Sequence, residues 1–172
     1  MDQENHADGN PQQNTTINMP LGAANDYLAE QVALLMASYR RLTGRELVTG
    51  AGTTVNTARR LFEAPFAIVS HDAAADPLFN YANRVALALF DLRWEEFIGM
   101  PSRLSAEAPA REERERLLER VKAKGFIDDY RGVRISGKGR RFLIEGATVW
   151  NLYDVAGHYR GQAARFDRWQ VL

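Results

Sequence analysis

The chain contains no cysteine among its 172 residues. This absence excludes disulfides, thiolate metal sites, cysteine nucleophiles and the flavin–cysteinyl adducts of some photoreceptors. An excess of charge is also missing, because 22 lysines and arginines balance 22 aspartates and glutamates. No net field draws such a chain onto DNA, RNA or an anionic membrane, so we expect no nucleic-acid partner and no membrane partner.

Long apolar runs are absent as well. No segment reaches the ~20 residues that a helix needs to span a bilayer, and the N-terminus has neither the basic start nor the apolar core of a signal peptide. We therefore expect a cytoplasmic protein. The length is that of a single domain, and 45% hydrophobic residues are enough to fill one core.

Three segments follow one another along the chain. Residues 1–24 are rich in Asn, Gln, Gly and Pro and poor in large apolar residues, which predicts a disordered tail. Residues 25–63 carry helical patterns and are expected to form an N-terminal helical extension. Residues 64–172 are expected to form the main domain.

The extension begins with the clearest amphipathic pattern of the sequence. Apolar residues recur every three or four positions over 27–43, which predicts a helix capped by Asn25 or Asp26 and ended by Gly44. Its apolar face is wide, so we expect the helix to pack on the domain or on a second copy of itself. A shorter helix, capped by Thr54, is expected to end before Pro65.

The main domain opens with two short strands, expected over 66–70 and 78–81. Asn83 then stands where it can cap an apolar helix. After a short helix at WEEFIG, a helix rich in Arg and Glu is expected from Pro109, a residue suited to a first helical turn, to Lys124.

The last part of the chain turns to β structure. Strands are expected over 126–136, 141–153 and 159–171, joined by the glycine-containing turns SGKG and DVAG. The order of elements therefore predicts an α+β domain whose single antiparallel sheet is covered on one face by helices.

Two separate blocks of this chain resemble a PAS domain. The first is carried by Tyr81, Ala82, Asn83, Leu89, Phe90, Ile98 and Gly99, and the second by Asp154, Gly157 and Gly161. The resemblance implies a PAS-like five-stranded antiparallel sheet with covering helices, to which the N-terminal helical extension is added. It also implies a fold that hosts many unrelated functions.

A narrower resemblance is to the MEKHLA-domain family, whose members occur alone in bacteria and at the C-terminus of plant homeodomain–leucine-zipper regulators. It is carried by the blocks SYRRLTGREL, APFAIVSHD, FNYANRVALALF, PSRLSAE, GFIDDYRGVRIS and GRRFLIEGATVWNL. The string that names the family is absent. Several blocks in one order are nevertheless a specific signal.

The resemblance implies a small-molecule cavity between the sheet and its helices. Strict alternation along 141–153 places Phe142, Ile144, Thr148 and Trp150 on one face, and Leu143, Glu145, Ala147, Val149 and Asn151 on the other. The candidate cavity residues are Arg103, Tyr130, Phe142, Ile144, Trp150 and His71. The alternative is that the aromatic residues simply fill the core.

The cofactors known from PAS domains each need particular residues. PAS domains that bind haem use an axial histidine, for which His71 and His158 are candidates, although both positions favour ordinary surface residues. Ser102 and Arg103 stand where light-oxygen-voltage domains carry Cys-Arg, and Gln162 is displaced by one residue from their flavin-contacting glutamine. We therefore expect Gln162 to point to the other face and no flavin photochemistry. The cofactor stays unknown, and no metal site is expected.

The resemblance implies a non-catalytic sensory module that binds a small organic ligand and signals to a partner. The alternative is a protein–protein interaction domain without a ligand. A third hypothesis is a small enzyme built on a cluster of Asp128, Asp129 and Glu145, which exposed strand acids explain equally well. The wide apolar face of the first helix further predicts a homo-oligomer.

Overall fold

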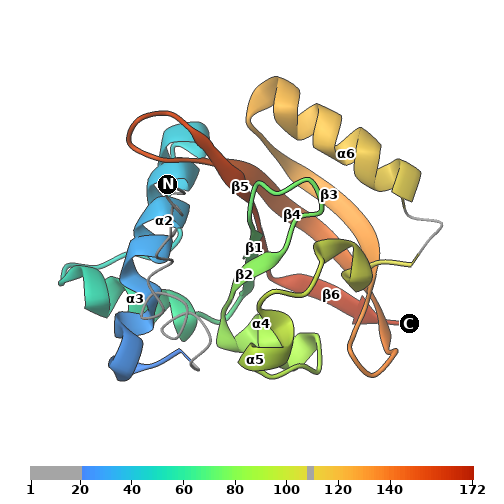
Figure 1. Ribbon diagram of the computed structural model, residues 1–172, viewed down its shortest axis with the longest axis horizontal. Coiled ribbons are helices and arrows are strands. Elements are labelled where there is room, and N and C mark those ends of the chain that lie inside the picture. The colour runs from blue at the N-terminus through green and yellow to red at the C-terminus, as the bar shows by residue number, and fades with distance from the viewer. Residues whose placement is uncertain (1–20, 108–110) are drawn as a thin grey trace, which may run out of the picture.

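The computed structural model describes residues 21–107 and 111–172, and it shows an antiparallel sheet with helices on both faces (Figure 1). Of the tail expected at residues 1–24, residues 1–20 lie outside the described residues, as does the helix start expected at Pro109. Leu21 already packs against the hydrophobic core. None of the helices in the described part is long and apolar enough to cross a membrane.

The sheet has the strand order β2-β1-β5-β4-β3, and all its pairs are antiparallel. The strands are β1 Ala67–His71, β2 Phe79–Ala82, β3 Phe126–Ile135, β4 Arg141–Tyr153, β5 Tyr159–Phe166 and β6 Arg168–Val171. The predicted α+β fold with its five-stranded PAS-like sheet is confirmed.

The strand expected over 159–171 is interrupted at Asp167, and its second part is β6. Arg165 of β5 lies opposite Thr148, and Arg168 of β6 lies opposite Glu145, so β6 continues the register of β5 along the same edge of β4. The interruption faces Gly146, where β4 itself is irregular.

Gly146 breaks the alternation of β4. Its φ is +61°, and the pairing with β3 skips a residue there, because Ile144 lies opposite Gly132 while Ala147 lies opposite Tyr130. The extra residue reverses which side chains face which side. The expected faces of β4 are therefore wrong: one face carries Phe142, Ile144, Ala147 and Val149, and the other carries Trp150 and Leu152.

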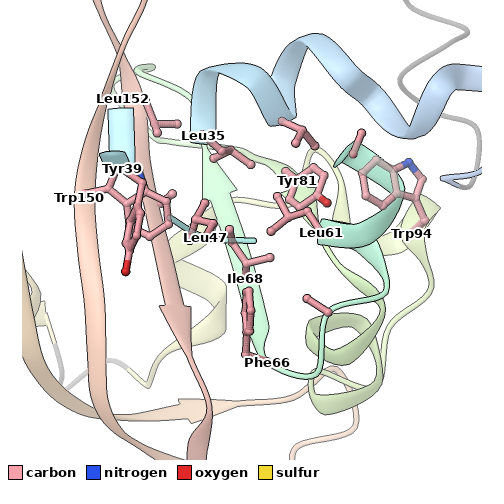
Figure 2. Close-up of a cluster of buried hydrophobic side chains, with 14 residues drawn as sticks. Leu35, Tyr39, Leu47, Leu61, Phe66, Ile68, Tyr81, Trp94, Trp150 and Leu152 are labelled. Atoms are coloured by element: carbon pink, nitrogen blue, oxygen red, sulfur yellow. The ribbon is translucent and has the colours of Figure 1, made fainter. Parts of the chain in front are cut away.

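The outer face, defined by Trp150 and Leu152, is covered by η1 Ala23–Leu28, α2 Ala29–Thr43 and α3 Thr54–Phe62. Figure 2 shows this cluster, in which the Tyr39 ring meets the Trp150 ring edge-on with centroids 4.9 Å apart. Helices thus cover both faces of the sheet and not one, and the first helix packs on the domain itself, which was one of its two expected positions. The apolar side of α2 is buried on its own sheet, with Leu35 fully enclosed.

The inner face, defined by Phe142 and Ile144, is covered by α4 Arg84–Leu89, α5 Trp94–Phe97, η2 Ser102–Ser105 and α6 Arg111–Lys124. Figure 1 places α6 beside β3, on the side of the sheet away from α2 and α3. The sheet thus separates two hydrophobic layers, and each layer has its own set of helices.

Helix ends follow local chemistry with two exceptions. Asn83 caps α4 and Gly44 ends α2 with φ +72°, both as predicted. The cap of α3 is Thr53, one residue earlier than expected. The expected cap of α2 is wrong: Asp26 through Leu28 have φ of 51°, 53° and 51°, so this left-handed turn ends the 3-10 segment and the α-helix begins only at Ala29.

Candidate functional site

A cavity of about 90 Å³ lies against the inner face of the sheet. Its walls come from five strands, the end of α4, η2 and α6. Most of the lining is apolar: Val69, Phe79, Phe90, Ala106, Leu117, Ile144, Ala147, Val149, Ala163, Ala164 and Phe166. The polar lining residues are His71, Ser102, Ser105, Tyr130, Arg134 and Gln162. A concave apolar site with a few polar groups is the usual form of a small-molecule site.

Gln162 supplies a buried side-chain amide to this wall. Its Nε2 donates to Oδ1 of Asn151 at 3.0 Å, and Nδ2 of Asn151 donates to the hydroxyl of Tyr153 at 3.3 Å. The expectation that Gln162 points away from the cavity is wrong. Gly161 adopts φ +126°, and the pairing of β4 with β5 is irregular beside it. Simple alternation along the strand therefore does not predict which face Gln162 is on.

Arg134 and Tyr130 are half-buried residues on β3. The guanidinium of Arg134 lies over the Tyr130 ring, 5.2 Å from its centroid, and its Nη1 donates to the Val133 carbonyl at 3.0 Å. Because both residues line the cavity and both keep contact with solvent, they form part of its rim. Stacking on an aromatic ring holds the planar guanidinium in place.

The η2 turn and the end of β1 supply the remaining polar groups. Ser102 and Ser105 are buried, and the Ser105 hydroxyl donates to the Ser102 carbonyl at 2.7 Å. His71 is half-buried, with Nδ1 2.8 Å from the Asp72 carbonyl. These groups are held by their own loops, so their positions are fixed before any ligand arrives.

Three of the six candidate cavity residues line this cavity, namely His71, Tyr130 and Ile144. Phe142 packs in the inner layer against the Phe90 ring without reaching the cavity. Trp150 lies on the outer face, because the bulge at Gly146 reverses its side. Arg103 is exposed on η2 and pairs with Asp76 at 3.1 Å. Phe142, Trp150 and Arg103, which were expected in the cavity, therefore do not line it.

The residues of the PAS motifs stabilise loops and strand ends. Asp154 accepts hydrogen bonds from the His158 and Ala156 amides and from the Arg160 guanidinium. These bonds, the His158 amide first, lower the pKa of Asp154 to about 2. Gly157 takes φ +84° in the same turn. These residues hold the hairpin and do not approach the cavity.

Tyr81 belongs to the outer layer. Burial raises the pKa of its phenol, and its hydroxyl has no hydrogen-bond partner among the described residues. Its ring meets Trp94 edge-on at 6.3 Å. Tyr81 is thus a packing residue of the motif, on the opposite side of the sheet from the cavity.

Haem and flavin do not fit the cavity as it stands. Sites for drug-sized ligands occupy about 300–1,000 Å³, and both cofactors fall in that size range, whereas this cavity has about 90 Å³. His158 is exposed and bonded to Asp154, and Ser102 supplies a hydroxyl where adduct chemistry needs a thiol. Within residues 21–107 and 111–172, no three His, Asp or Glu side chains gather to hold a metal ion.

The three acids considered for catalysis are not brought together. Each makes an exposed ion pair with a different arginine: Asp128 with Arg45 at 3.5 Å, Asp129 with Arg120 at 2.9 Å, and Glu145 with Arg131 at 3.8 Å. Such pairs are ordinary surface contacts.

Sequence reasoning missed Arg134, Ser105 and Gln162 as lining residues. The available signal was glycine inside a long strand, which often marks a bulge. Gly146 and Gly161 are both such glycines, and both take positive φ.

Comparisons with solved structures agree with the fold. The PAS domain of a Colwellia psychrerythraea protein is 17% identical, with a TM-score of 0.55 over 68% of this chain and 94% of that one. A fungal LOV domain photoreceptor is 17% identical, with a TM-score of 0.54 over 88% of this chain and 100% of that one. The light-state dimer of the fungal photoreceptor Vivid is 14% identical, with a TM-score of 0.53 over 78% and 90%. At these identities the likeness concerns the fold alone.

A search of curated proteins gives no match. The profile of the MEKHLA domain, in contrast, matches residues 29–171, which include α2 and every strand. A match over most of the chain shows that this protein belongs to the MEKHLA domain family.

Proposed function

We propose that the chain is a non-catalytic, cytoplasmic sensory module that binds a small organic ligand in the inner-face cavity and passes the change to a partner. The observation that carries the proposal is the cavity itself: an apolar space with six polar residues on its walls, built from both the sheet and its covering helices. A ligand there touches five strands, the end of α4, η2 and α6.

The size of the cavity limits the ligand. An apolar cavity of about 150 Å³ holds benzene, and this cavity has about 90 Å³. The ligand is therefore a compact molecule, with its polar end toward the half-buried rim at Arg134 and Tyr130. A larger ligand requires the α6 side of the wall, which includes Leu117, to move.

A route from the cavity to the outer layer supports a sensory role. The chain of hydrogen bonds from Gln162 through Asn151 ends at Tyr153. The Tyr153 backbone in turn accepts from the Ser38 hydroxyl at 3.2 Å and donates to it at 3.0 Å. Because Ser38 lies on α2, a change in the Gln162 amide reaches the outer helix through Asn151 and Tyr153.

The second candidate is a self-association domain without a ligand. A homo-oligomer was expected from the apolar face of α2, but this face packs against the sheet of its own chain. Exposed apolar residues remain at the C-terminal strand, where Trp169, Val171 and Leu172 are 36%, 51% and 56% exposed. An edge strand of this kind offers a surface to a second copy.

Mass spectrometry and thermal denaturation separate the two candidates. A sensor releases a bound compound on denaturation, or gains thermal stability in a metabolite screen, because a ligand that binds only the folded state stabilises it. Ala164→Leu, which fills the cavity, is expected to abolish that gain. Its control Ala156→Leu, in the exposed β4–β5 turn, is expected to retain it.

The absence of a ligand together with self-association would support the interaction domain. If no compound is released, the screen is flat, and light scattering shows a dimer, the ligand-sensing function is wrong.

A further inference from the structure

The charge of the cavity wall is one-sided. Among the described lining residues, Arg134 is a permanent cation and none is an aspartate or a glutamate. A guanidinium that borders an apolar space and has no acidic neighbour favours an anionic ligand. Part of the solvent is excluded there, so the carboxylate of a ligand stabilises the unpaired positive charge.

Arg134 differs from its neighbours in this respect. Other arginines of β3, β4 and their connecting turn have carboxylate partners: Arg131 has Glu145, Arg140 has Asp91, and Arg141 has Glu107. In the part of the chain that the structure describes, no carboxylate lies within ion-pair distance of Arg134. The only hydrogen bond of its guanidinium to a described residue goes to the Val133 carbonyl.

The geometry leaves most of the guanidinium available. A guanidinium carries five N–H donors in a planar fork, which can hold both oxygens of a carboxylate. One donor of Arg134 is used by the Val133 carbonyl, and the plane is held over the Tyr130 ring. The remaining N–H groups stand at the rim of the cavity without a partner among the described residues.

The rest of the wall defines the other end of the ligand. Behind the rim the cavity is lined by Ile144, Val149, Leu117 and Phe166, and its volume is about 90 Å³. This space suits a short branched hydrocarbon body, and Arg134 is the one permanent cation among the described lining residues.

We propose that Arg134, stacked on Tyr130 at the rim of an apolar cavity, makes this site selective for a small monocarboxylate whose hydrocarbon body enters the cavity. The proposal rests on the proposed sensory function, because it names the ligand class of the same cavity. The acid group stays at the half-exposed rim, so its desolvation is limited, and the hydrocarbon body accounts for the buried contacts.

The test compares acids with neutral analogues of the same shape on the full chain. Isovalerate and isobutyrate are titrated against isovaleramide and isobutyramide by calorimetry and by thermal denaturation. A charge-assisted bidentate contact is expected to make each acid bind at least about tenfold more tightly than its amide.

Two variants locate the effect. Arg134→Gln is expected to weaken acid binding by about tenfold or more and to leave amide binding unchanged. Arg131→Gln, a matched change on the same strand at an exposed arginine, is expected to leave both unchanged. If Arg134→Gln fails to fold, the acid and amide affinities of the unaltered protein still decide the selectivity.

The outcomes distinguish the two proposals. Amides that bind as well as the acids, with binding blocked by Ala164→Leu, would overturn the carboxylate selectivity and leave the sensory function standing. Acid binding that survives Arg134→Gln would overturn the role of Arg134. If neither the acids nor the amides bind, and no compound is released from the purified protein, both proposals are wrong.

Discussion

The side-chain amide of Asn83 joins three elements of this fold. Its oxygen accepts from the Ile68 and Ala86 amides, each at 3.1 Å, and its nitrogen donates to the Phe66 carbonyl at 2.7 Å and the Leu61 carbonyl at 3.3 Å. The residue is fully buried. One side-chain amide thus provides hydrogen-bond partners for backbone groups at the start of α4, at the first strand and at the end of α3. Leaving these buried groups unpaired would destabilise the fold.

Asn83→Ala is expected to destabilise the fold by about 2–4 kcal/mol, because it removes a helix cap and leaves buried backbone groups unpaired. Thr53→Ala is the control, since Thr53 caps α3 at an exposed position through one bond to the Asn56 amide. The control is expected to cost about 1 kcal/mol. Urea denaturation measures both variants, and equal losses would contradict the role given to Asn83.

Single residues also show what the sequence could predict. The cap at Asn83 and the stop at Gly44 depend on contacts within a few residues, so both were predictable. The start of α2 was not, because Tyr27 and Leu28 take a left-handed conformation that residues of these types rarely adopt. Arg134 could not be recognised either, since its significance depends on the absence of a carboxylate that only the folded chain reveals.

At the scale of elements, the strands were found and their faces were not. The positions of β3, β4 and β5 follow from composition and turn signals. Strict alternation predicts the face of a residue only where the strand has no bulge. The irregularities at Gly146 and Gly161 each shift the alternation of their strand. For this reason Trp150 was placed in the cavity and Gln162 outside it, the reverse of what the structure shows.

The irregularity at Gly161 also brings two backbones close together. A Cβ at Gly161 would overlap the carbonyl oxygen of His71, a cavity residue, in addition to the strain of φ +126°. Gly161→Ala is expected to cost about 3 kcal/mol or more, since the clash involves backbone that cannot move aside. A drop in the urea midpoint measures this loss.

Gly157→Ala is the matched control for Gly161→Ala. Gly157 also has positive φ, at +84°, but a Cβ there meets nothing within 4 Å. Only the conformational cost of about 1–2 kcal/mol is expected. Similar losses at the two glycines would show that the contact with His71 has no separate effect.

At the scale of the whole molecule, the helices on the outer face are part of the same structure as the sheet. Gln31 of α2 donates to the Ser70 hydroxyl at 3.3 Å and to Asn80 Oδ1 at 3.5 Å, and Ser38 bonds the Tyr153 backbone. The predicted division into an extension at residues 25–63 and a domain at 64–172 therefore describes the order of the chain. We propose that the two parts unfold together.

Leu35→Ala tests this proposal. Leu35 is fully buried between α2 and the outer face of the sheet, so the change is expected to cost about 2–5 kcal/mol. If the chain is one cooperative unit, this loss lowers the melting temperature of the whole protein by about 5–15 °C. Far-UV circular dichroism and tryptophan fluorescence are then expected to report the same transition, because Trp150 and Trp94 lie in the outer-face cluster.

Leu104→Ala provides the comparison. Leu104 is 52% exposed on η2, so its truncation removes little buried surface and is expected to shift the melting temperature by less than about 2 °C. The decisive contrary result is an early loss of helical signal in Leu35→Ala while the later transition keeps its original midpoint. Helix α2 would then be a separately stable attachment, and a signal from Gln162 to Ser38 would have to pass between two units that do not unfold together.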